Sequence, residues 1–143
     1  MKRKLISFVT LLATAFCFIF CFGSCITFGK AKAVVVETTE TLVVICVNET
    51  DENATLFDVM EDLQKENELQ FELTGTMLKS LNGTKNAADF SSCWMLYTSD
   101  TEMGNDEWGT YDYGKVACVS AVLGGDALIV SAGEYYVWVY TTF

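Results

Sequence analysis

Residues 55–65 read Thr-Leu-Phe-Asp-Val-Met-Glu-Asp-Leu-Gln-Lys, and they carry the clearest helical pattern in the chain. Leu56, Val59, Met60 and Leu63 recur at the spacing of one helix face. Thr55 and Asp58 occupy the two positions of a reciprocal capping box. We therefore predict a helix over residues 56–67. This segment decides the fold class, because the other regular segments have the pattern of β-strands.

Outward from this helix, short runs rich in β-branched and aromatic residues are separated by polar turns. One pair of runs precedes the helix and about six follow it. A single helix packed on a mixed or antiparallel sheet of about five to seven strands is an α+β architecture. The expected strands are 34–36, 41–47, 69–73, 77–81, 93–97, 116–123, 127–130 and 135–142, with Asn82-Gly83 as a turn and residues 99–114 as a long acidic loop.

The N-terminus has the order of features of an export signal. Lys2, Arg3 and Lys4 precede an apolar run, and Ala31-Lys32-Ala33 fits a signal peptidase site, with cleavage after Ala33. A lipoprotein signal over residues 1–24, with Cys25 lipidated, and an uncleaved anchor are the alternatives. We expect residues 34–143 to form a single domain, extracellular or at the cell surface.

The part beyond residue 33 is strongly acidic. It keeps four lysines against nineteen acidic residues, which gives a net charge of −15. Such a charge opposes contact with nucleic acid or anionic lipid headgroups. The membrane is therefore expected to matter only through the signal segment or a lipid anchor.

Catalytic and metal-binding patterns are weak in this sequence. The chain has no His, which removes Ser-His and Cys-His pairs and imidazole ligands. The acidic loops at 51–53 and 100–107 do not have EF-hand spacing. Cys46, Cys93 and Cys118 lie in apolar runs, where buried free thiols are favoured over one disulfide. We expect no catalytic residue, no metal and no cofactor.

Aromatic residues are the remaining candidates for binding. Alternation puts Tyr136, Trp138 and Tyr140 on one face of the last strand, either as core or as a contact surface. Trp108, Tyr111 and Tyr113 fall in the expected polar loop, where binding groups often lie.

One set of short motifs resembles a known family. Residues 75–83, Gly-Thr-Met-Leu-Lys-Ser-Leu-Asn-Gly, are followed by Ser-Cys-Trp-Met-Leu-Tyr at 92–97 and by Gly133-Glu134 before the last strand. This order resembles the transcobalamin C-terminal-like domain of bacterial surface proteins. The resemblance covers most of residues 41–143 and implies a β-grasp-like fold. It also implies a corrinoid such as cobalamin as a ligand, with Trp94 and Tyr97 as contact residues.

The sequence thus predicts an exported, non-enzymatic module that binds a corrinoid or another small planar or hydrophobic ligand. The alternative is an adhesion domain that binds a cell-surface protein or glycan through the aromatic loop 108–113. A small hydrolase is the third hypothesis. Such an enzyme could use a pair of carboxylates, and the many Asp and Glu residues of this chain neither identify nor exclude such a pair.

Overall fold

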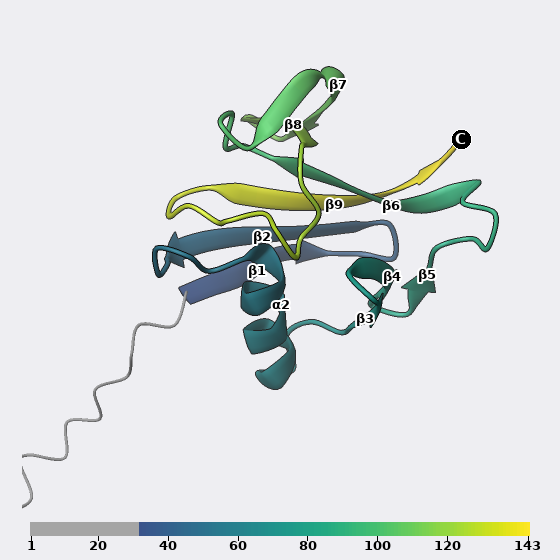
Figure 1. The fold of residues 1–143 in the computed structure, drawn as a ribbon, viewed down its shortest axis with the longest axis horizontal. Helices are drawn as coiled ribbons and strands as arrows, with labels where there is room; N and C mark the ends of the chain where they lie inside the picture. Colours follow the sequence, from purple (N-terminus) through teal and green to yellow (C-terminus); the bar gives the residue numbers. More distant parts are fainter. Residues whose placement is uncertain (1–31) are drawn as a thin grey trace, which may run out of the picture.

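A computed structural model describes residues 32–143, and strands dominate this part of the chain (Figure 1). Six strands form one antiparallel sheet in the order β1-β2-β9-β6-β8-β7. Its strands are β1 (Lys32–Thr38), β2 (Leu42–Glu49), β6 (Ser92–Thr98), β7 (Gly104–Tyr113), β8 (Val116–Ala121) and β9 (Tyr135–Thr142). A second sheet of three short strands consists of β3 (Phe71–Thr74), β4 (Met77–Leu81) and β5 (Thr84–Lys85).

The helix α2 spans Leu56–Lys65, which confirms the predicted helix with an end two residues earlier. Its capping box is formed as predicted: Thr55 N–H donates to Asp58 Oδ2 over 2.8 Å, and Asp58 N–H donates to Thr55 Oγ1 over 3.2 Å. The segment after β8 satisfies two more free N–H groups of the first turn. Leu56 N–H donates to the carbonyl of Leu128 and Phe57 N–H to that of Gly125, both over 2.9 Å.

Two apolar clusters lie on opposite faces of the large sheet. On β2, Val43 and Ile45 belong to the inner cluster, and Val44, between them, belongs to the outer one. The inner cluster also holds the buried side chains of α2. The outer cluster includes residues of β7 and β8, and Figure 1 shows this hairpin at the opposite end of the strand order from α2.

The predicted α+β, β-grasp-like class is wrong. Strands make up 53% of the described residues and the helix only 9%, and the strand pairs are antiparallel. In Figure 1, α2 runs across the strand direction and extends past β1, and its five buried side chains belong to the inner cluster. One ten-residue helix is too short to form a layer of its own, so the described part is a mostly β fold with one short helix that contributes to the inner cluster.

Two segments account for much of this error. Residues 104–113 form the ten-residue strand β7, although they were expected as loop. The strand predicted at 127–130 is absent except for an isolated bridge between Ile129 and Thr55. The backbone of this segment bonds to the start of the helix and not to a strand. The Leu128 carbonyl accepts from Leu56 N–H, and Val130 N–H donates to the carbonyl of Ala54 over 3.0 Å.

The export prediction falls mainly outside the described residues. This holds for the signal segment up to residue 31 and for the lipidation candidate Cys25. Ala33, the predicted cleavage position, lies in β1 and pairs with Val47 of β2. Within residues 32–143, no helix is long and apolar enough to cross a membrane.

Candidate functional site

An apolar groove lies where the pairing of the large sheet is incomplete. Strand β6 pairs with β9 along its whole length, from Ser92 to Thr98, but with β8 only at Tyr97 and Thr98. Beyond these two pairs, residues 86 and 87 cover part of the β6 edge, since Ala87 N–H donates to the Ser92 carbonyl and Trp94 N–H to Asn86 Oδ1. A groove of about 380 Å³ runs beside this part of the strand. That volume is within the usual range for small-ligand pockets. The groove is lined by Phe57, Thr76, Met77, Leu78, Asn86, Phe90, Cys93, Trp94, Met95, Leu96, Ser120, Ala121, Gly124, Gly125, Asp126 and Trp138.

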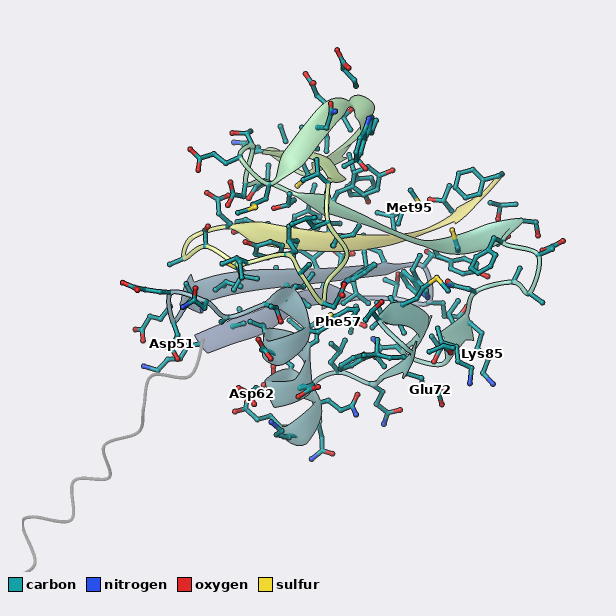
Figure 2. The ribbon with its side chains drawn as sticks, viewed as in Figure 1. Asp51, Phe57, Asp62, Glu72, Lys85 and Met95 are labelled. Atoms are coloured by element: carbon teal, nitrogen blue, oxygen red, sulfur yellow. The ribbon has the colours of Figure 1, made fainter. Side chains whose placement is uncertain are left out.

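One wall of the groove is fixed by the contact between α2 and the turn after β8. Figure 2 shows Phe57 next to the first turn of α2 and beneath the sheet. Its ring lies so close to Gly125 that a Cβ there would be 2.3 Å from Cε1 of Phe57. Because only a glycine allows this approach, Gly125 sets the position of the phenyl ring.

Trp94 is held by hydrogen bonds on both its backbone and its ring. Its indole N–H donates to the carbonyl of Thr84 over 2.9 Å, and its backbone N–H donates to Asn86 Oδ1 over 2.9 Å. Tyr140 packs edge-on against the indole, with ring centroids 5.4 Å apart, and its hydroxyl donates to the carbonyl of Lys85 over 2.8 Å. Trp94 thus ties the small sheet to the large one as well as lining the groove.

Trp138 lies opposite Leu96 in the β6–β9 ladder and is only 5% exposed. Among the described residues, its indole Nε1 is the buried side-chain polar atom without a hydrogen-bond partner. A buried donor without an acceptor costs about 1–3 kcal/mol. Trp138 is also among the residues that line the groove, so a ligand bound there would contact this side chain.

Phe90 stands at the groove with an unusual backbone. Its φ is 58°, in the left-handed region that bulky side chains rarely adopt, and its side chain is 50% exposed. The loop is held by the hydrogen bond from Phe90 N–H to the carbonyl of Ala87, over 3.0 Å. Strained residues of this kind cluster at binding sites. Phe90 and the half-exposed Met77 leave apolar surface facing solvent beside the groove.

Charge plays a small part in the groove. Asp126 is the one ionisable carboxylate in its lining, and it is exposed. Cys93 is a free thiol whose Sγ lies 3.9 Å from Sδ of Met95. Within residues 32–143, no cluster of three or more Cys, Asp or Glu side chains is arranged to hold a metal ion.

A second set of aromatic residues, from β6, β7 and β9, lies outside the groove lining. Tyr97 and Tyr111 have ring centroids 5.7 Å apart, and Tyr113 and Tyr135 are paired at 6.3 Å. Trp108 adds a side chain that is 63% exposed. We call these five residues the outer aromatic surface. The hydroxyl of Tyr113 donates to the Glu37 carboxylate, and this hydrogen bond, with a small contribution from burial and the charge of Glu37, raises the pKa of Tyr113.

The expected position of Trp108, Tyr111 and Tyr113 in a loop is wrong, because all three belong to β7. The register between β7 and β8 is regular from Thr110 to Tyr113 and irregular between Asn105 and Thr110. Such an irregularity accommodates the Gly and acidic residues that gave this segment the composition of a loop. Trp108 lies in the irregular part, which explains its exposure.

The structure divides the predicted binding residues between two faces. Trp94 lines the groove on the inner side, whereas Tyr97, Tyr111 and Tyr113 belong to the outer cluster. On β9, Tyr136 and Trp138 belong to the core, which decides the alternative left open for that face. The sequence contained no sign of the unpaired indole of Trp138 or of the strained Phe90, because both features depend on tertiary contacts.

Two buried acids lie away from the groove. Burial raises the pKa of the free thiol of Cys118 to about 11 and that of the Tyr136 hydroxyl to about 12. The Tyr136 hydroxyl accepts from the backbone N–H of Ser131 over 2.8 Å, and this bond partly opposes the effect of burial. Both groups are therefore protonated at neutral pH and part of the packing.

No family model, curated protein or solved structure matches this chain significantly. The resemblance to the transcobalamin C-terminal-like domain stays a prediction that rests on short motifs.

Proposed function

We propose that the protein is an exported, non-enzymatic module that binds a small, predominantly apolar ligand in the groove beside β6. The observation that carries this proposal is the apolar lining of the groove, which includes Trp138, with its unpaired buried indole N–H, and the half-exposed Phe90. The ligand is expected to bring one oxygen or nitrogen acceptor to this donor. Its remaining surface would contact Phe57, Phe90 and Leu96.

The size of the groove and the net charge of the described part of the chain restrict the class of ligand further. A volume of about 380 Å³ suits a compact molecule, and a corrinoid would place only an edge of its ring there. Nineteen acidic residues against five lysines in the described part favour a neutral or cationic ligand over an anionic one.

The test is a titration of the mature protein, purified after expression of the full chain, with the neutral planar dye Nile red and separately with cobinamide. Saturable binding of the dye that is weakened in Phe90→Gly supports the proposal, because that variant removes a groove side chain and relieves the strained backbone. Phe143→Gly is the matched control, since Phe143 is 75% exposed and lies outside the groove lining. Equal loss in both variants, or no saturable binding of either compound, would contradict it. Binding of cobinamide would specifically support the corrinoid prediction.

The outer aromatic surface favours a second candidate, the binding of a cell-surface glycan or protein. The 63% exposure of Trp108 is the observation behind it, because few contacts within the protein use this side chain. Retention on insoluble polysaccharide should be lost in Trp108→Ala, which should change stability by less than about 0.5 kcal/mol. Retention that does not differ between the two proteins would rule out this surface.

A further inference from the structure

Three sulfur-bearing side chains gather in the lining of the groove. They are Met77, from β4, and Cys93 and Met95, from β6. All three are at least partly exposed, and none of them belongs to the inner or the outer cluster. Methionine and free cysteine are ordinarily core residues, so packing of the core does not account for this group of sulfur atoms.

The sulfur atoms of Cys93 and Met95 are already in contact. The two residues are separated by one position on β6, so their side chains point to the same face of the strand. The free thiol of Cys93 donates a weak hydrogen bond to Sδ of Met95 over 3.9 Å. A metal ion about 2.3 Å from each of two sulfur atoms, at trigonal angles, would hold them about 4.0 Å apart. The spacing of this pair is therefore the one that a shared metal ion requires.

The kind of donor atom indicates the class of ion. Thiolate and thioether sulfur select soft ions such as Cu⁺, whereas hard cations prefer oxygen ligands. A set of one thiol and two thioethers also differs from the clusters of thiols and carboxylates that residues 32–143 lack. One thiolate would balance the charge of one Cu⁺, and the excess of acidic residues over lysines in the described part attracts cations to the surface.

We propose that Cys93, Met95 and Met77 form a binding site for Cu⁺ in the groove beside β6. The thiol proton of Cys93 is released to solvent, and the thiolate and Sδ of Met95 bind the ion from one strand. Met77 supplies the third sulfur from β4, because its side chain is 50% exposed in the same groove and can change rotamer to reach the ion. This inference goes beyond the proposed function, since it requires neither Trp138 nor Phe90.

The test measures Cu⁺ binding by the mature protein, purified after expression of the full chain, in anaerobic competition with the chelator bathocuproine disulfonate. We expect one Cu⁺ per chain. Loss of groups that support a metal site costs about 10–100-fold in affinity, so Cys93→Ser, Met95→Leu and Met77→Leu should each weaken binding by at least about tenfold. Cys46→Ser is the matched control and should bind as the unaltered protein does. Cys46 is also a free, partly exposed thiol, but its sulfur has Asn48 Oδ1 as its partner, at 3.8 Å.

A second measurement uses the unaltered protein and does not depend on the folding of any variant. Lys65 and Lys115 place Cys46, Cys93 and Cys118 in three different tryptic peptides, so alkylation by iodoacetamide can be followed at each thiol. Bound Cu⁺ should protect Cys93 from alkylation and leave the rate at Cys46 unchanged.

The outcomes separate this site from the proposed function. Failure to bind Cu⁺ in competition with the chelator, or protection of Cys46 in place of Cys93, would overturn the metal site. An affinity that falls in Cys93→Ser but in neither Met variant would also overturn it, because the thiol would then act alone. Nile red binding without Cu⁺ binding rejects the metal site and leaves the apolar ligand, whereas Cu⁺ binding without Nile red binding supports the metal site and rejects the proposed function.

Discussion

The unpaired indole of Trp138 makes a specific prediction about stability. Trp138 and Trp94 line the same groove and are 5% and 6% exposed, and both belong to the inner cluster. Changing either one to Phe removes the same atoms, so the cost of lost packing is similar at the two positions. The two variants differ mainly in the hydrogen bonding of the indole N–H.

The expected difference follows from these hydrogen bonds. Trp94→Phe loses the bond to the carbonyl of Thr84, which contributes about 1 kcal/mol, whereas Trp138→Phe removes an unpaired donor whose burial costs about 1–3 kcal/mol. Trp94→Phe should therefore lower the free energy of unfolding by about 2–4 kcal/mol more than Trp138→Phe does. Urea denaturation followed by far-ultraviolet circular dichroism measures this quantity without relying on Trp fluorescence.

The same pair of variants tests the ligand site. Trp138→Phe should weaken binding of an acceptor-bearing ligand by about five- to tenfold, the effect of one hydrogen bond of about 1 kcal/mol. If the two variants lose equal stability within about 0.5 kcal/mol, the indole of Trp138 has a partner in solution, and the argument for an acceptor on the ligand fails.

Three further predictions concern the supports of the groove and the buried thiol. Gly125→Ala should destabilise the protein by about 1–3 kcal/mol in urea denaturation, because the new Cβ would overlap the ring of Phe57. The control Gly124→Ala should cost clearly less, because its Cβ would meet only the flexible carboxylate of Asp126. Equal costs for the two variants would contradict the close contact at Gly125. Thr55→Ala should cost about 1 kcal/mol through loss of the helix cap, and Thr55→Ser should recover most of it; a Ser variant as unstable as the Ala variant would argue against the cap. The thiol of Cys118 ionises near pH 8.5 when unfolded but near pH 11 when folded, so folding stability should fall as pH rises through this range, by up to about 1.4 kcal/mol per unit. The Cys118→Ala variant should lose this part of the pH dependence, and an unchanged profile would refute it.

Local sequence patterns predicted several elements of the fold correctly. The helix and its cap depend on residues within one turn of each other, and the Asn82-Gly83 turn depends on two adjacent residues with positive φ. The strands β2, β6 and β9 are rich in β-branched or aromatic residues, a composition that local reasoning can recognise. Such features are decided by interactions that are short in sequence.

The fold class required information of another kind. Strand β7 has a composition that favours a loop, and it is a strand because residues 110–113 pair with β8 across a tight turn. Residues 127–130 have the composition of a strand, yet their backbone groups bond to the helix N-terminus. In both cases a tertiary hydrogen-bond partner overrides local preference. Sequence alone predicted the helix but not its orientation relative to the strands.

The candidate site was also beyond local patterns, because it exists where regular pairing stops. Strand β6 pairs with β9 along one side, whereas along the other side it pairs with β8 only at its end and is otherwise covered in part by residues 86 and 87; no property of residues 93–96 indicates this arrangement. The unpaired Trp138 and the strained Phe90 lie along the same opening. The unpaired donor of Trp138 and the left-handed backbone of Phe90 each lower the stability of the fold. A bound ligand would offset the first cost by supplying an acceptor, and it would also cover the exposed ring of Phe90. That three departures from regular structure meet in one groove is the main reason to look for the ligand there and not on the more conspicuous outer aromatic surface.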